Sequence, residues 1–301
     1  MMLGLLEVVI GLVFVLLLLS LLATTIMELL SSGLALRGKN LEKALRNMLA
    51  SADADEKLFK QFKDNSLYKQ LSQRYGKSRR RSPSYLSADS FQSILFDVLL
   101  EGEGVDRIQE RIDSLPDRDL KHVLNQLLND ADYRLDEFRS NIRNWYDNVM
   151  DRASGWYKRN IQKILVAVGL AIAVIFNADT IAIYERLESD PEALQQILAM
   201  AEDYLLIQGD SLTTTENPLM RESLDKINYL INQEIDEASA PLGLGWGGVD
   251  VQSLSWQDWA LKVLGWIVTA LAVSLGAPFW FDLLKKLVNI RGSGKKPKAE
   301  A

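Results

Sequence analysis

The stretch that decides the fold class lies at the N-terminus. Residues 3–30 read LGLLEVVIGLVFVLLLLSLLATTIMELL, in which Glu7 and Glu28 are the only charged side chains. About 20 mostly apolar residues in a helix are enough to cross the hydrocarbon core of a bilayer. The stretch is longer than the apolar region of a secretory signal, and no Lys or Arg precedes it. We therefore interpret residues 1–30 as a retained transmembrane helix.

Two further stretches have the same character. Residues 164–184 contain one charged side chain, Asp179, and residues 259–281 contain one, Lys262. Each is long enough to span a bilayer as a helix. The sequence therefore predicts an all-α integral membrane protein with transmembrane helices at 1–30, 161–184 and 259–281.

Positive charge near the ends of the spans predicts the orientation. Lys and Arg follow the first and third spans and precede the second, whereas residues 185–258 hold 15 acidic residues and three basic ones. Short basic flanks mark the cytoplasmic side. We expect an N-terminus outside, a helical cytoplasmic domain at 31–160, an acidic and mostly helical extracytoplasmic segment at 185–258, and a basic, flexible cytoplasmic tail at 282–301.

Aromatic and basic residues cluster where the spans should meet the headgroups. Trp and Tyr favour this depth, and Lys and Arg are attracted to anionic lipid there. The predicted interface residues are Trp156, Tyr157, Lys158, Arg159, Lys163, Trp256, Trp259 and Trp280.

The segment 31–160 shows helical periodicity. Ser87 is a predicted N-cap for a helix whose apolar face begins with Phe91, Ile94 and Leu95. A heptad-like pattern then starts at Leu124 and leads towards the second span. Its later members are Leu135, Phe138, Ile142, Trp145 and Val149. Such a seam fits a coiled coil between subunits, or an amphipathic helix packed on its own domain if Asn129 and Asp130 break it.

Small residues in the spans favour close packing of helices. Gly169, Ala173 and Asn177 lie on one stripe of the second span, where an amide is able to bond across the contact. The partner helix is in the same chain or in another one. In the third span, Gly276 and Pro278 predict a kink or an end of the helix.

Few features point to chemistry. The chain has no Cys and one His, and no Walker loop, His-Glu-x-x-His or Gly-x-Ser-x-Gly pattern occurs. We expect no catalytic residue, metal or cofactor, and no enzyme activity. The glycine-rich residues 242–248 predict a flexible or membrane-grazing turn. The basic run 77–81 fits anionic headgroups or a solvated loop. Nucleic acid is not an expected partner, because residues 31–160 hold 23 basic and 20 acidic residues.

Charged residues inside predicted spans carry the remaining functional hypothesis. In the predicted orientation Glu7, Asp179 and Lys262 all lie towards the outer face. They form a buried charge cluster for transport, or they reach interfacial water while Lys262 pairs with Asp258.

Several phrases resemble a widespread family of uncharacterised bacterial multi-span membrane proteins. They are LRGKNLEK at 36–43, PSY at 83–85, MDRASGWYKR at 150–159, NADT at 177–180 and SLGAPFWFD at 274–282. The resemblance implies a multi-pass protein of the bacterial inner membrane, and it implies no catalytic residues.

The sequence therefore favours a non-catalytic scaffold that forms homo-oligomers in the lipid bilayer. A subunit of an oligomeric channel or transporter using Glu7, Asp179 and Lys262 is the alternative. An enzyme whose site leaves no linear motif is a third interpretation.

Overall fold

The computed structural model describes residues 2–50, 56–75, 79–208, 229–242, 244–247, 250 and 252–293. Within these residues the chain is helical apart from one short antiparallel pair of strands, so the prediction of a helical protein is confirmed. Contacts between Cα atoms divide the chain into two compact units. Unit 1 comprises residues 1–33 and 161–301, and unit 2 comprises residues 34–160.

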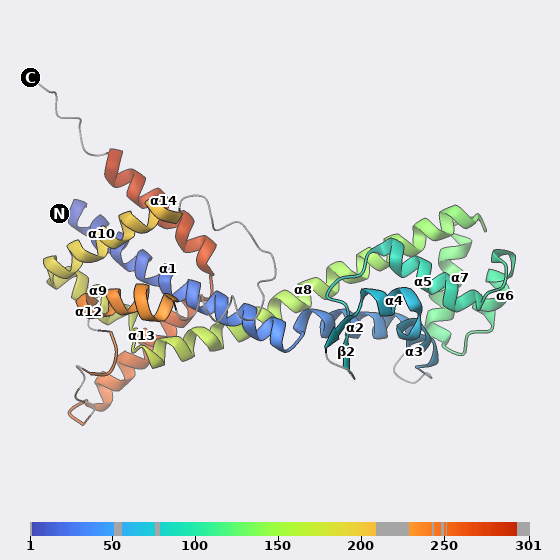
Figure 1. Ribbon diagram of the computed structural model, residues 1–301, viewed down its shortest axis with the longest axis horizontal. Coiled ribbons are helices and arrows are strands. Elements are labelled where there is room, and N and C mark those ends of the chain that lie inside the picture. The colour runs from blue at the N-terminus through green and yellow to red at the C-terminus, as the bar shows by residue number, and fades with distance from the viewer. Residues whose placement is uncertain are drawn as a thin grey trace, which may run out of the picture. The chain divides into compact units, whose positions relative to one another are not determined.

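Unit 2 begins with short helices and ends in the first part of a long one (Figure 1). Its elements are α2 (Leu36–Leu49), α3 (Lys57–Asp64), α4 (Ser66–Leu71), β1 (Gln73–Tyr75), β2 (Arg79–Arg81), α5 (Ala88–Leu100), η1 (Val105–Arg107), α6 (Ile108–Asp113), α7 (Arg118–Asn129) and the part of α8 (Leu135–Ile175) up to residue 160. Of the predicted basic run, residues 77 and 78 lie outside the described residues and 79–81 form β2.

Aromatic side chains form the centre of the unit 2 core. Phe91 stacks on Tyr146 with ring centroids 4.6 Å apart, and the ring centroid of Phe62 lies 5.4 Å from that of Phe91. Ser87 caps α5 by accepting a hydrogen bond from the backbone N–H of Ser90, as predicted. Burial of such large side chains is the main stabilising contribution in a domain of this kind.

The predicted heptad seam is not one continuous helix. Between α7 and α8, Asp132 and Tyr133 both have positive φ, a backbone conformation that ends a right-handed helix. The two helices instead form a hairpin, in which the Asn141 amide donates to the carbonyl of Leu127 at 3.1 Å. Leu124 on α7 and Phe138 on α8 are buried in the same core.

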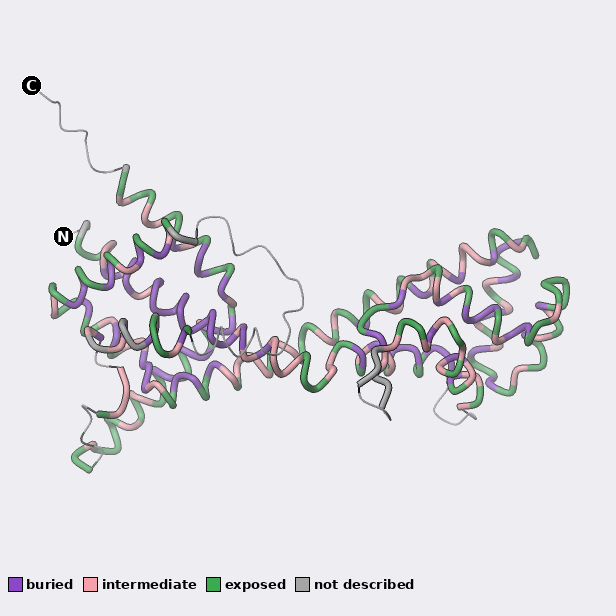
Figure 2. The backbone as a smooth tube through the Cα atoms, viewed as in Figure 1, coloured by how far each residue is buried: buried purple, intermediate pink, exposed green. Residues whose placement is uncertain are grey.

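Unit 1 is built around α1 (Met2–Gly33). Figure 2 shows buried residues along most of this helix. Its neighbours are α9 (Thr180–Ser189), α10 (Pro191–Gln208), α13 (Trp256–Val273), α14 (Ala277–Ser293) and the π-helical turn η2 (Leu230–Ile235), which leads into α12 (Asp236–Leu242). Much of the segment 185–258 therefore packs on α1, although 209–228 and four further residues of it lie outside the described residues.

Judged by length and apolar composition, one described helix is able to cross a membrane, the stretch Gly4–Gly33 of α1. The pairs α8–α9 and α13–α14 pass the same test only when each bent pair is taken as one span, which raises the number to three. The first pair bends by 50° and the second by 91°. The residues predicted as the second and third spans, 161–184 and 259–281, are therefore each interrupted by a bend, and the bend in the third was predicted at Gly276.

The 91° bend follows from the predicted break at Gly276. This residue has φ +86°, which glycine adopts without strain. Pro278 lies in the first turn of α14, where proline is tolerated. After the bend α14 packs along α1. Residues 282–293 are consequently helical and not a flexible tail, while 294–301 lie outside the described residues.

Candidate functional site

The break between α8 and α9 is the most polar place in the apolar part of unit 1. Its centre, Asn177, has φ +45° and is buried. The last carbonyls of α8 need partners because the helix stops there. The indole Nε1 of Trp246 donates to Val174 O at 2.9 Å, and the N–H of Gly245 donates to Phe176 O at 2.7 Å. The described part of the predicted flexible turn is therefore docked on the end of α8.

Asp179 begins α9. The residue is 7% exposed, and its carboxylate accepts hydrogen bonds from the backbone N–H groups of Ile181 and Ala182 at 2.9 and 3.3 Å. It is thus an N-cap, a common structural use of Asp at this position. A Cβ at Gly265 of α13 would overlap this carboxylate, so only glycine fits there.

Lys262 lies one turn before Gly265 on the same face of α13. Its Nζ donates to Oδ1 of Asn177 at 2.8 Å and lies 5.9 Å from the ring centroids of Trp246 and Trp266. Indole faces attract a cation at this range. The pairing of Lys262 with Asp258 is wrong, because Asp258 caps α13 through Ser255.

Thr269 completes the contact between α13 and the break. Its hydroxyl lies 2.8 Å from Ala178 O and 2.9 Å from Gly265 O, and it accepts the N–H of Thr180 at 3.1 Å. Sequence reasoning missed Gly265, Trp246 and Thr269. The spacing of Lys262, Gly265 and Thr269 on one helical face was the available signal.

Glu7 is not part of this cluster. Its carboxylate pairs with Arg291 of α14, whose Nη2 lies 3.0 Å from Glu7 Oε1 and whose Nη1 lies 2.6 Å from Glu202 of α10. The structure therefore unites Asn177, Asp179 and Lys262, and gives Glu7 a separate partner.

The residues predicted for contacts between subunits lie inside the chain. Phe138 and Ile142 are completely buried, and Leu135, Trp145 and Val149 pack against the same core. Gly169 allows the backbone of α13 to approach, since a Cβ there would lie 3.1 Å from Ala270 O. Ala173 is buried as well. The small-residue stripe is therefore used for packing within one chain.

The residues predicted for the membrane interface divide into two groups by exposure. The exposed or half-buried ones are Trp156, Tyr157, Lys158, Arg159, Lys163, Trp256 and Trp259. Trp280 differs from them. This residue is buried, and its Nε1 donates to Ala272 O at 2.8 Å. The break before α14 leaves that carbonyl without the N–H four residues on, and it accepts from the indole and from the N–H of Leu275, at 3.1 Å, instead.

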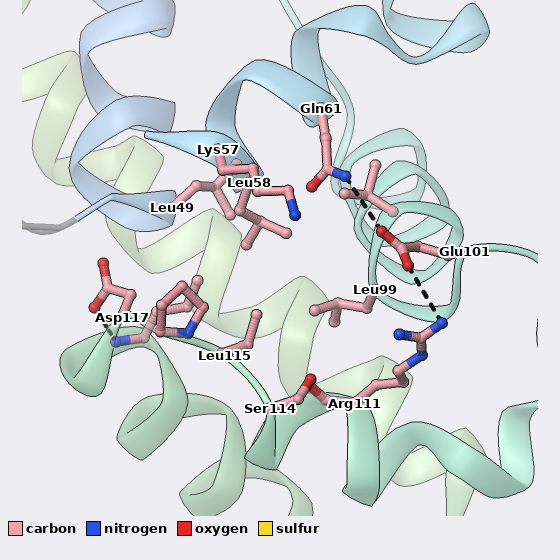
Figure 3. Close-up of a pocket in the computed structure, with 13 residues that line it drawn as sticks. Leu49, Lys57, Leu58, Gln61, Leu99, Glu101, Arg111, Ser114, Leu115 and Asp117 are labelled. Atoms are coloured by element: carbon pink, nitrogen blue, oxygen red, sulfur yellow. Dashed lines mark hydrogen bonds and ion pairs between the residues drawn. The ribbon is translucent and has the colours of Figure 1, made fainter. Parts of the chain in front are cut away.

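Unit 2 contains a small cavity of about 160 Å³ (Figure 3). Leu49, Leu58 and Leu115 contribute apolar surface to it. At its rim Glu101 accepts from Gln61 at 3.3 Å and pairs with Arg111 at 3.3 Å. Glu101 and Arg111 thus neutralise each other, and the cavity is too small for most ligands.

A second cavity of unit 2 measures about 420 Å³, and we call it the α2–α8 groove. The groove is lined by Arg37 and Asn40 of α2, by Ser84 and Tyr85 of the loop between β2 and α5, and by Asp147, Asp151 and Tyr157 of α8. Residues from three of the phrases quoted above, at 36–43, 83–85 and 150–159, line this groove.

The walls of the groove are held by specific contacts. The hydroxyl of Tyr146 donates to Leu86 O at 2.6 Å, and burial raises the pKa of Tyr146, so this phenol stays protonated. A Cβ at Gly38 would lie 2.6 Å from Ser82 O, so glycine is required where the loop crosses α2. The Asn40 amide donates to Ala153 O at 3.3 Å and ties α2 to α8.

Glu42 fixes the same loop through its carboxylate. It accepts hydrogen bonds from Lys63 and from the hydroxyl of Ser82. Burial raises the pKa of Glu42, but the hydrogen bonds and the charge of Lys63 outweigh it, and the net effect lowers the pKa. The charged form of Glu42 is therefore the one that supports the groove.

The fold and sites define a helical protein with one to three candidate membrane spans. Comparison of the chain with protein-family models, with curated proteins and with solved structures finds no match in any of the three. Among the described residues there is no group of three or more His, Cys, Asp or Glu placed to hold a metal ion.

Proposed function

We propose that this chain is a multi-pass protein of the bacterial inner membrane that acts as a non-catalytic scaffold. In this proposal unit 1 is embedded in the bilayer and unit 2 is the helical domain that the scaffold holds at the cytoplasmic surface. The family resemblance supports the localisation to a bacterial membrane. The main observation in favour of embedding unit 1 in the bilayer is the exposed apolar surface of α13.

The outward face of α13 is hydrocarbon from Leu261 to the end of the helix. Leu261, Leu264, Val268 and Leu271 recur at helical spacing, and each is at least 39% exposed. The opposite face packs on Gly169 and on the α8–α9 break. Exposed apolar surface of this extent is rare on soluble monomers.

The length of α13 also suits a bilayer. The helix has 18 residues. At the usual rise per residue this corresponds to about 27 Å, close to the thickness of a hydrocarbon core. The exposed apolar face is therefore long enough to face lipid over most of the membrane.

The end of α8 adds a second surface of the same kind. Leu170, Val174 and Ile175 are exposed, and no charged residue occurs between Lys163 and Asp179. Lipid chains cover such a surface without a further protein. The apolar surface of unit 1 therefore lies mainly on α8 and α13, whereas α1 is enclosed by other helices.

The ionisable residues of unit 1 favour a scaffold over a transporter. Asp179 caps α9, Lys262 holds Asn177, and Glu7 pairs with Arg291. Each therefore has a structural partner. Because the predicted seam is buried within one chain, self-association must use other surfaces, and it stays a prediction.

Lysine substitutions on the outward face of α13 test the embedding. Leu264→Lys together with Leu271→Lys places two charges in hydrocarbon at a cost of about 2.5 to 3.5 kcal/mol each. The fraction of the chain that stays in the membrane after extraction with alkaline carbonate should therefore fall. Leu71→Lys on exposed α4 of unit 2 is the matched control and should change nothing. A parent chain that is released from membranes by alkaline carbonate would contradict the proposal.

The mass of the complex in nanodiscs tests the scaffold itself. Assemblies of more than one chain are expected, and monomers at every protein concentration would contradict homo-oligomerisation. The measurement uses the parent chain, because substitutions at Phe138 or Ile142 disturb the core of unit 2.

A transporter subunit is the second candidate, and the two broken helix pairs favour it. Interrupted spans often form ion sites in transporters. Asp179→Asn keeps an N-cap because Asn caps helices as well as Asp does. Ion flux in proteoliposomes that this variant abolishes would favour transport, whereas no flux in the parent favours the scaffold.

A further inference from the structure

The α2–α8 groove carries charges of both signs that have no partner in the described residues. Arg37 stands on α2, and Asp147 and Asp151 stand on α8. None of the three forms an ion pair or a hydrogen bond within the part of the chain that the structure describes. The ion pairs of unit 2 lie elsewhere on its surface.

The two carboxylates lie on one face of α8, because residues four apart are neighbours on a helix. Like charges in this arrangement repel each other by a few tenths of a kcal/mol, and a cation between them removes the repulsion. Arg37 is also farther than ion-pair distance from both. The groove therefore presents separate places for an anionic group and for a cationic group.

Residues that line the groove lie close, along the sequence, to both ends of unit 2. Arg37 is three residues after the first residue of unit 2, and Tyr157 is three residues before the last. The apolar part of α8 starts at Ile164. The helix between Tyr157 and Ile164 measures only about 10 Å at the usual rise per residue.

Aromatic surface accompanies the charges of the groove. Tyr85 lines the groove and is exposed, and Trp156 of α8, which is next to the lining residue Tyr157 in the sequence but does not itself line the groove, is exposed as well. Tyr and Trp are the residues that favour headgroup depth, because one end of the side chain is apolar and the other is polar. The position and the side chains of the groove therefore both suit a lipid headgroup.

We propose that the α2–α8 groove binds a phosphoethanolamine group, supplied by an aminophospholipid of the surrounding membrane. The guanidinium of Arg37 takes the phosphate, and the carboxylates of Asp147 and Asp151 take the primary ammonium. The volume of about 420 Å³ is in the range of small-molecule sites. The lipid source rests on the membrane embedding proposed above, whereas the chemistry of the groove does not.

Other headgroups fit this charge pattern less well. A phosphoglycerol group has no cation, so it leaves both carboxylates facing each other. A phosphocholine group has a cation without N–H donors, so it makes no hydrogen bond to Asp147 or Asp151. Both should bind more weakly than phosphoethanolamine.

The test measures binding of short-chain lipids to the full chain in detergent. Dihexanoyl phosphatidylethanolamine, phosphatidylglycerol and phosphatidylcholine are compared, with glycerophosphoethanolamine as the soluble form of the same group. The parent should prefer phosphatidylethanolamine. Arg37→Gln should weaken both phosphatidylethanolamine and phosphatidylglycerol by about tenfold, the effect of losing one charge-assisted hydrogen bond.

Asp151→Asn distinguishes the headgroups. It should weaken phosphatidylethanolamine by about tenfold and strengthen phosphatidylglycerol, because a repulsive charge is removed. Controls are Arg152→Gln and Asp136→Asn, two exposed positions of α8 outside the groove. They should leave all affinities unchanged, and all four variants should keep the unfolding temperature of the parent.

The outcomes separate the two proposals. Equal binding of phosphatidylethanolamine and phosphatidylglycerol, or equal effects of the groove and control variants, would overturn the phosphoethanolamine site. Binding of glycerophosphoethanolamine without the lipid, with the same dependence on Arg37 and Asp151, would keep the chemistry and overturn the lipid source. Because binding is measured in detergent, failure of the membrane embedding shows in the carbonate extraction alone.

Discussion

Arg291 and Glu7 form an ion pair across a separation of 284 residues. Nε and Nη2 of the guanidinium lie 3.2 and 3.0 Å from Oε1 of the carboxylate. The orientation expected from the basic flanks places Glu7 outside and the flank containing Arg291 in the cytoplasm. Both assignments cannot hold for one folded chain, because the pair requires the start of α1 and the end of α14 to be at the same place.

Cysteine labelling in this cysteine-free chain checks the relationship directly. Leu5→Cys and Asn289→Cys introduce exposed thiols near the two ends. Both should react with an impermeant maleimide from the same side of the membrane. Asn144→Cys in unit 2 serves as a marker of the cytoplasmic side. Labelling of positions 5 and 289 from opposite sides would contradict the packing of α14 on α1.

Loss of the ion pair should destabilise unit 1. The Arg291 side chain is 13% exposed, and its contacts with Glu7 and Glu202 are charge-assisted. Arg291→Met should lower the free energy of unfolding by about 1.5 to 3 kcal/mol, measured by detergent-driven unfolding. Arg186→Met removes the half-exposed pair with Asp190 and should cost only about 0.5 kcal/mol. Equal losses of unfolding free energy in the two variants would show that the pair of Arg291 with Glu7 stabilises the chain no more than an ordinary surface pair.

Gly265 and Asp179 should be coupled. Gly265→Ala introduces a methyl group that overlaps the Asp179 carboxylate, and overpacking of this kind costs about 1 to 3 kcal/mol. In a background of Asp179→Ala the same change should be nearly neutral. Gly155→Ala on α8 is the control, since no atom lies within 4 Å of a Cβ built there. Additive effects of the two substitutions, measured in a double-mutant cycle, would refute the contact.

Phe138 should report on the core of unit 2 and not on assembly. The side chain is completely buried and its ring lies against Phe96. Phe138→Ala should therefore lower the free energy of unfolding by about 3 to 5 kcal/mol. Below the unfolding temperature the mass of the complex in nanodiscs should not change. Val105→Ala, at an exposed position, is the control. Dispersal of a complex without loss of stability would restore the seam between subunits.

Glu42 should make unit 2 sensitive to acid. Its folded pKa is lowered below the ordinary 4.5, so its contribution to stability is present above that pH and is lost as the pH falls through the folded value. Glu42→Gln should therefore destabilise the chain at neutral pH and much less in acid. Thermal unfolding across this range measures the difference. The exposed Asp136→Asn should show no such pH dependence, and a constant difference for Glu42→Gln would refute the assignment.

Several local features could be predicted because they depend on neighbours in the chain. The apolar run of α1, the cap at Ser87 and the break at Gly276 are written in consecutive residues. Asn177, Asp179 and Lys262 could be identified because charged and amide groups are rare in apolar stretches. Their contacts could not be identified, because Trp246, Gly265 and Thr269 reach them from distant segments.

The sequence by itself determined the helical class, the apolar stretches and the residue types available at each break, since these follow from composition and from period along one chain. Only the tertiary structure decided that α1 is enclosed while α13 faces outward, and that the seam of α8 is internal. The same holds for Arg291, which meets Glu7 only because α14 turns back along α1. An apolar pattern along a helix predicts that one face will be buried away from water. Which element buries that face depends on bends of the backbone, and the periodicity of a single segment does not predict them.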